Sequence, residues 1–162
     1  FSLVLQDTWL FSGSIYDNIR YGRLDARKDE IISAAKMANV HHYIRTLTKG
    51  YDSLINEEAN NISQGEKQLL TIARAILKDP QILILDEATS SVDTRLERRL
   101  QEAMHRVMQG RTSFVIAHRL STIRNADEIC VMHEGEIVER GKHEELLALD
   151  GYYKRLCDMQ SF

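Results

Sequence analysis

Residues 82–85 form an uninterrupted run of four aliphatic side chains, and Asp86 and Glu87 follow it directly. A short apolar run without polar alternation predicts a strand that is buried on both faces of a sheet. Patterns with helical spacing lie on either side of this run, at 65–78 and at 93–108. Because strands that alternate with helices favour parallel pairing, we expect an α/β fold with a largely parallel core sheet.

The same alternation continues along the rest of the chain. Asp79 and Pro80 end the helix predicted at 65–78, because proline cannot continue a helix. A second buried strand is predicted at 112–117, and the polar residues 57–61 predict a loop. Further strands are expected at 1–5, 128–132 and 137–139, with a hairpin turn at 133–136, and further helices at 29–40, 41–47, 142–149 and 151–159.

The composition is that of a soluble protein with a buried core. The chain has 162 residues, of which 43% are hydrophobic and 28% charged, enough for one domain. Its net charge of −3 gives no reason to expect nucleic acid or an anionic membrane surface as the main partner. No apolar run approaches the roughly 20 residues that span a bilayer. The two cysteines, Cys130 and Cys157, are expected to be reduced thiols in a cytosolic protein.

The acidic pair after the central strand is the strongest local signal for chemistry. Ligands of α/β sheets bind outside the carboxyl ends of the strands, which is where Asp86 and Glu87 are predicted to lie. Asp86 could hold Mg²⁺ through water, and Glu87 could polarise an attacking water. The alternative is that the two side chains only cap the helix that follows. Their sequence context, with the apolar run before them and residues 88–93 after them, favours the functional interpretation.

Residues 62–66 open the longest apolar helix, and they permit two interpretations. Ser63 followed three positions later by Glu66 is the pattern of a capping box, which needs no ligand. A helix N-terminus with Gly65 beside it is also suited to bind an anion, because its free N–H groups point outward. Both interpretations use the same N–H groups.

Two other polar residues follow predicted strands. His118 comes directly after the strand at 112–117, and Gln6 comes after the strand at 1–5. A lone histidine is more often structural than functional, and a single glutamine in a loop carries little information. Their expected place beside Asp86 and Glu87 makes a contact with a phosphate group plausible.

Five segments, in this order along the chain, resemble the motifs of the ATP-binding cassette (ABC) nucleotide-binding domain of exporter type. Residues 4–19 are similar to the Q-loop region, 62–68 to the signature motif, 82–87 to a Walker B strand with its catalytic glutamate, 90–93 to the D-loop, and 117–122 to the switch-histidine segment. The resemblance covers the whole chain. It implies a P-loop NTPase (RecA-like) parallel sheet core with an inserted α-helical signature subdomain at about 16–80, the catalytic core being 1–10 and 81–162.

The resemblance also implies residue roles and partners. Two such domains dimerise head to tail, and each signature motif meets ATP held by the other domain. The catalytic residues would be Glu87 as base, His118 at the γ-phosphate, and Gln6 as a sensor of Mg²⁺ and the attacking water. Asp86 and Gln6 would support Mg²⁺. The residues that contact the partner's ATP or communicate with it would be Ser63, Gln64, Gly65, Glu66 and Asp93. The protein would act with transmembrane domains, at the cytoplasmic face of the cell membrane, and without nucleic acid.

The sequence departs from the family pattern in several places, and two of these departures bear on function. No G-x-x-x-x-G-K-[ST] phosphate-binding loop occurs, although it should precede Gln6, and Phe1 already begins a strand pattern. We therefore expect that the chain begins inside its domain and that it shows no ATPase activity by itself. In the signature, Glu66 stands where glutamine is usual and should repel phosphate mildly, so Glu66→Gln should raise ATP affinity at the partner site.

Two other functions remain possible on the sequence alone. A soluble ABC-type ATPase that acts on DNA or ribosomes would share the motifs, but such relatives commonly carry long insertions or basic surfaces, which this sequence lacks. In isolation the chain could also be a non-catalytic fragment that offers its signature helix to another domain.

Overall fold

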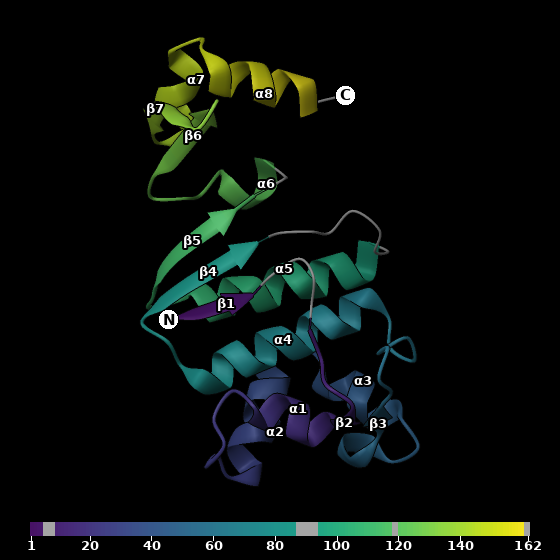
Figure 1. Ribbon diagram of the computed structural model, residues 1–162. Helices are drawn as coiled ribbons and strands as arrows, with labels where there is room; N and C mark the ends of the chain where they lie inside the picture. The colour runs from purple at the N-terminus through teal and green to yellow at the C-terminus, as the bar shows by residue number, and fades with distance from the viewer. Residues whose placement is uncertain (5–8, 87–93, 118–119, 161–162) are drawn as a thin grey trace. The chain divides into compact units, whose positions relative to one another are not determined.

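The computed structural model of the chain describes residues 1–4, 9–86, 94–117 and 120–160 (Figure 1). The chain divides into two compact units, Phe1–Ile116 and Ala117–Phe162, each with its own hydrophobic core. In the described part of the chain, no helix is both long enough and apolar enough to cross a membrane.

The first unit contains a three-stranded parallel sheet. Its strands are β1 (Ser2–Val4), β4 (Ile82–Asp86) and β5 (Thr112–Ile116), in the order β1-β4-β5. All three were predicted from their apolar runs, and their parallel pairing confirms the α/β class. Two long helices, α4 (Gln64–Lys78) and α5 (Thr94–Met108), supply the connections between them.

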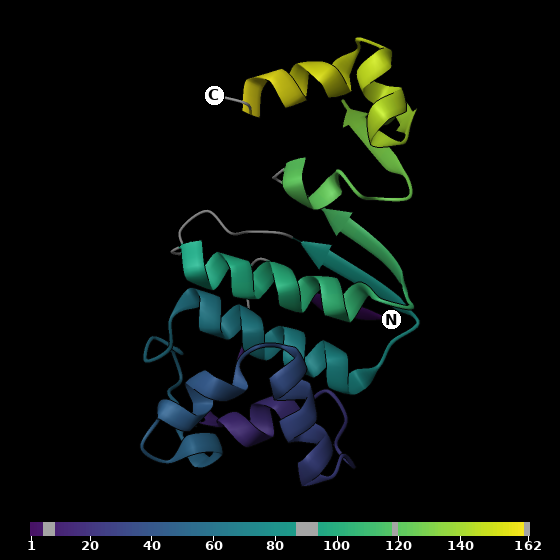
Figure 2. The same cartoon turned by 180° about the vertical axis from the view of Figure 1, so that it is seen from behind.

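The sheet is covered on one face. Figures 1 and 2 show α4 and α5 on the same side of the strands. Leu83 and Leu85 point to that side and are fully buried, whereas Ile82 is 45% exposed and Phe114 is 61% exposed. Within the described residues, the prediction that the strand at 82–85 is buried on both faces is therefore wrong, and the strand at 112–117, which was predicted to be buried, is exposed at Phe114. Successive side chains of a strand point to opposite faces, so a helix layer on one side buries only alternate residues.

Three short helices and a small ladder precede α4. The helices are α1 (Ile15–Arg20), α2 (Lys28–Met37) and α3 (His41–Thr46), and a 3₁₀ turn follows at Gly50–Asp52. Strand β2 (Gly13–Ser14) pairs antiparallel with β3 (Leu54–Ile55). The sequence patterns indicated α2 and α3 but neither α1 nor the two-residue ladder. The polar loop at 57–61 is confirmed as a turn region.

Helix α2 ends three residues before its predicted end at Val40. The C-cap is Ala38, and Asn39 adopts a left-handed conformation with φ of 57°. Asparagine tolerates this conformation better than most residues, so it suits the position that ends a helix. Val40 then becomes the buried N-cap residue of α3.

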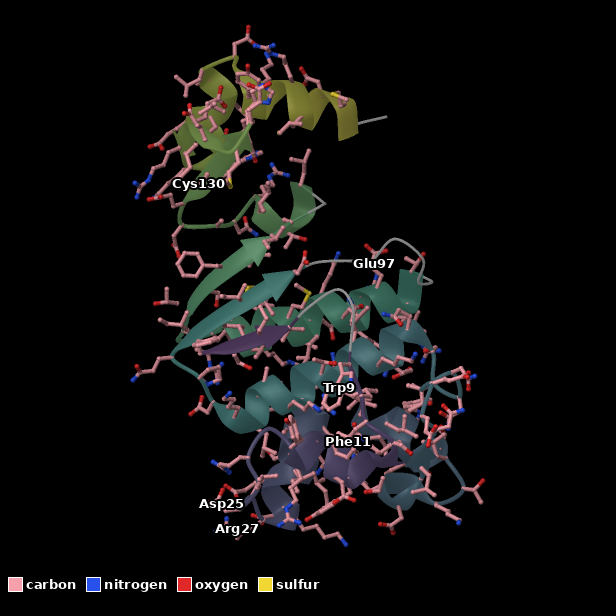
Figure 3. The ribbon with its side chains drawn as sticks, in the orientation of Figure 1. Trp9, Phe11, Asp25, Arg27, Glu97 and Cys130 are labelled. Carbon is pink, nitrogen blue, oxygen red and sulfur yellow. The ribbon has the colours of Figure 1, made fainter. Side chains whose placement is uncertain are left out.

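The buried guanidinium of Arg74, on α4, binds α1 and the segment that precedes it. Its guanidinium donates to the backbone oxygens of Asn18 (2.5 Å) and Trp9 (2.6 Å) and to Asn18 Oδ1 (2.6 Å). The rings of Trp9, Phe11 and Tyr21 lie 5.5–5.8 Å from the guanidinium carbon, within range of a cation–π contact. Figure 3 shows Trp9 and Phe11 in this segment. Burial lowers the pKa of Arg74 to about 10, so the side chain is still charged at neutral pH.

The second unit has a short helix, a hairpin and two closing helices. Its elements are α6 (Leu120–Ile123), β6 (Ile129–His133), β7 (Glu136–Gly141), α7 (His143–Ala148) and α8 (Tyr152–Gln160). The predicted hairpin is confirmed, with Glu134 and Gly135 at positive φ in its turn. Cys130 and Cys157 form no disulfide in the described part of the chain.

Candidate functional site

The N-terminus of α4 is built around Ser63. This residue is the N-cap, in an extended conformation, and its Oγ accepts a hydrogen bond from the N–H of Glu66 at 3.3 Å. One half of the predicted capping box is thus confirmed. The first N–H groups of any α-helix have no partner inside the helix, so they and the positive end of the helix dipole face what lies before it.

An open cleft of about 900 Å³ lies at this helix end. The signature residues Ser63, Gln64, Gly65 and Glu66 all line it, so the structure brings these four predicted residues into one site. The other lining residues come from the α2–α3 region and from the start of α5: Lys36, Asn39, His41, His42, Tyr43, Thr46, Arg95, Leu96, Arg99 and Glu102. Three of the lining side chains are lysine or arginine and two are glutamate, which leaves the cleft slightly positive.

The carboxylate of Glu66 is paired inside the cleft. Its side chain is only 10% exposed and accepts two hydrogen bonds from Arg99, at 2.9 Å and 3.4 Å. Arg99 also donates to the backbone oxygen of Asn39 at 2.6 Å. The negative charge in the first turn of α4 therefore has a cation beside it.

Asn39 ties the α2–α3 turn to α5. Its Nδ2 donates to the backbone oxygen of Arg99 (3.3 Å) and to Glu102 Oε2 (3.0 Å), and its Oδ1 accepts from Arg106 at 2.7 Å. Arg106 donates in addition to the backbone oxygen of Met37 at 3.0 Å. The left-handed turn that ends α2 is thus fixed by side chains of one face of α5.

Two titratable residues of the cleft have shifted pKa values. Burial, followed by the positive charges of Lys36 and Arg45, lowers the pKa of His41, so its ring is neutral at pH 7. His41 Nδ1 and the Tyr51 hydroxyl share a hydrogen bond of 2.8 Å. Burial, and secondly the charge of Glu66, raises the pKa of Tyr43. At neutral pH, His41 therefore adds no positive charge to the cleft and Tyr43 adds no negative charge.

Asp86 is the last residue of β4, at the carboxyl end of the sheet where it was predicted. It pairs in register with Ile116, and it lines a small cavity together with Gln68 of α4 and Met104 of α5. Its side chain is partly buried. A carboxylate at the end of a parallel strand is a suitable oxygen ligand for Mg²⁺.

The other predicted site residues lie outside the described residues. These are Gln6, Glu87, Asp93 and His118, and their predicted roles remain predictions. Sequence reasoning missed Arg99 and Asn39, which the structure adds to the site. A residue of Asn type just after the apolar spacing of α2 is a helix-end signal that could have pointed to Asn39. Arg99 has no comparable signal, because α5 reads only as a charged helix.

The sequence matches the family described as ABC transporter over residues 1–90. The chain belongs to the ABC transporter family. An ABC transporter ATP-binding protein of Bacillus subtilis, YfiC, is 55% identical over 157 residues, which cover 97% of this chain and 26% of that protein. A Mycobacterium bovis fatty acid ABC transporter ATP-binding/permease protein is 57% identical over 95% of this chain and 24% of its own length.

Two further ABC proteins extend the comparison. An ATP-dependent lipid A-core flippase of Syntrophus aciditrophicus is 54% identical over 98% of this chain and 26% of its own length. The solved structure of a bacterial Atm1-family ABC exporter with ATP bound superposes with a TM-score of 0.90 at 42% identity, covering 99% of this chain and 28% of that one. The chain spans about a quarter of the length of the ABC relatives that it matches.

Proposed function

We propose that this chain is part of the nucleotide-binding domain of an ABC exporter and takes part in the ATP binding and hydrolysis that power export of a substrate. The observation that carries the proposal is the open cleft at the start of α4, which the signature residues line together with Lys36, Arg95 and Arg99. Because the chain belongs to the ABC transporter family, ATP is the ligand that we expect in this cleft. A helix N-terminus with nearby cations suits the phosphate groups of that ligand.

The nucleotide in this cleft is held by a second domain. Head-to-tail dimerisation, as a homodimer or a heterodimer, brings the partner's ATP to the signature motif, where Ser63 and Gly65 contact its γ-phosphate and Gln64 and Glu66 line the site. The openness of the cleft supports this arrangement, because Ser63 and Gln64 are exposed at the start of α4, although Gly65 and Glu66 are buried.

The chain also supplies residues to the ATP bound by its own domain. In this proposal Asp86 supports Mg²⁺ together with Gln6, Glu87 is the general base, and His118 contacts the γ-phosphate. Asp93 communicates with the partner domain. Phosphoryl transfer depends on positioning and on charge neutralisation more than on covalent chemistry, and these residue types supply both. The position of Asp86 at the carboxyl end of β4 supports this assignment.

The proposed domain organisation follows from the same family relationship. Residues 16–80 form the helical signature subdomain, and residues 1–10 and 81–162 belong to the catalytic core. The complete protein works with transmembrane domains at the cytoplasmic face of the membrane. The relatives include a permease protein and a flippase, which favours export over an ATPase that acts on DNA or ribosomes.

The test is the ATPase activity of the complete transporter that contains this chain, reconstituted in lipid vesicles. We expect Glu87→Gln to abolish ATP turnover while substrate-independent ATP binding remains. Glu136→Gln makes the same change at an exposed position of strand β7 and serves as the matched control, with unchanged turnover. Full turnover by the Glu87→Gln transporter would refute the proposed role.

The polypeptide of 162 residues by itself is expected to show no measurable ATPase activity, because its sequence contains no P-loop motif. The assay is phosphate release by the purified chain with Mg²⁺ and millimolar ATP. Turnover that Glu87→Gln removes would show this expectation to be wrong. ATP-dependent association of the chain with an intact nucleotide-binding domain would support its behaviour in isolation as a non-catalytic module.

A further inference from the structure

The first turn of the signature helix, α4, carries a negative charge that opposes the binding of phosphate. Glu66 lies in the first turn of α4, beside the N–H groups that face phosphate in the proposed function. A carboxylate there stabilises the helix through its dipole but repels an incoming triphosphate. The side chain is nearly buried, so solvent screens its charge weakly.

The structure provides a counter-ion from a distant part of the chain. Arg99 is 33 residues away in sequence, on α5, and its guanidinium forms two hydrogen bonds to the Glu66 carboxylate. Arginine matches a carboxylate with its planar, two-pronged donor geometry, and it stays charged at all physiological pH values. Arg99 also lines the cleft itself, so its charge acts where the phosphate groups would lie.

We propose that Arg99 is a positioning residue for nucleotide at the signature cleft: it neutralises Glu66 and holds the start of α4 in a form that accepts phosphate. The inference rests on the proposed function. It identifies a side chain outside the signature motif that decides how strongly this motif binds the partner's ATP.

The geometry separates this role from a purely structural one. Arg99 and Arg106 lie on the same helix, and both bind Asn39, Arg99 at its backbone oxygen and Arg106 at its Oδ1. Arg106 is not among the residues that line the cleft, and its described hydrogen bonds go to Asn39 and Met37. Loss of either arginine weakens the tie between the α2–α3 turn and α5, but only loss of Arg99 exposes the charge of Glu66.

The test measures the KM for ATP and the kcat of the complete transporter in five forms. These are the unaltered protein, Arg99→Gln, Glu66→Gln, the Arg99→Gln/Glu66→Gln double variant, and Arg106→Gln as the matched control. Glutamine is used at Arg99 because it removes the charge and keeps an N–H donor for the Asn39 backbone oxygen. Arg99→Lys is a second variant, which keeps the charge if the glutamine form does not fold.

The KM for ATP should rise as the net charge of the side chains at positions 66 and 99 becomes more negative. We expect Arg99→Gln to raise the KM for ATP about tenfold, because it leaves a poorly screened negative charge near the phosphate groups. The double variant should return the KM to within about twofold of the unaltered protein, since its pair is again neutral. Glu66→Gln should lower the KM, and Arg106→Gln should leave it nearly unchanged. Arg99→Lys keeps the charge but not the two-pronged geometry, so it should raise the KM less than Arg99→Gln does. The effect should fall on KM more than on kcat.

Three results would overturn the inference. One is a double variant that keeps the high KM of Arg99→Gln, another is an equal increase in Arg106→Gln, and the third is the same KM in all forms. Failure of the proposed function looks different, because the unaltered transporter would then lack ATP turnover that depends on Glu87.

Discussion

The buried guanidinium of Arg74 allows a quantitative prediction about the stability of the first unit. Replacement by methionine, Arg74→Met, keeps an unbranched side chain of similar length but removes the guanidinium and its three hydrogen bonds. The backbone oxygens of Asn18 and Trp9 lose this donor inside the packed segment. Each such loss costs about 1–3 kcal/mol.

Two further terms decide the size of the effect. The three aromatic contacts of the guanidinium are worth about 0.5–1 kcal/mol each, and they are lost as well. Against this, the variant no longer buries a charge, an unfavourable contribution that is visible in the lowered pKa of Arg74. Because this gain offsets part of the loss, we expect Arg74→Met to reduce the free energy of unfolding by about 3 kcal/mol.

Tryptophan fluorescence can follow this experiment without an added label. Its single tryptophan, Trp9, lies against Arg74, so urea unfolding followed by tryptophan fluorescence reports on this cluster directly. Far-UV circular dichroism in the same titration tests whether helix loss coincides with the fluorescence change. Arg27→Met is the control, since the Arg27 side chain is 74% exposed and pairs with Asp29 and Glu30 at the surface (Figure 3). If Arg74→Met shifts the urea midpoint no more than this control does, the guanidinium does not organise the segment and the reasoning fails.

Two other changes test the packing and the titration of the same unit. Gly22→Ala should destabilise it by more than about 2 kcal/mol, because the added Cβ would lie 2.3 Å from the backbone oxygen of Arg74; an unchanged melting temperature would show that α1 can move away from α4 at little cost. Burial raises the pKa of Tyr51 to about 12, so its contribution to stability is complete below pH 10 and is lost as the pH rises from 10 toward 12. Tyr51→Phe should therefore remove about 1 kcal/mol of the stability loss measured between pH 9 and pH 11.5, and identical pH dependence of the two proteins would contradict this assignment.

Elements with strong local patterns were predictable. The helix predicted at 65–78 differs from α4 by one residue, because its apolar spacing is regular and Asp79, with φ of 51°, ends it before Pro80. The signature residues of the cleft were also found from sequence, since their order along the chain is itself the signal. The end of α2 was missed because Asn39 ends the helix through its backbone conformation, which periodicity does not report.

The sequence alone determined most of the helices and strands, though not α1, α6 or the β2–β3 ladder. It also determined that the central strands are parallel and which family the motifs resemble. Apolar spacing and motif order are properties of neighbouring residues, so they can be read without coordinates. Only the tertiary structure decided that one sheet face is covered, that Arg74 is surrounded by three aromatic rings, and that Glu66 is neutralised by Arg99. Burial and charge pairing depend on which distant segments pack together, and no local pattern specifies that partner.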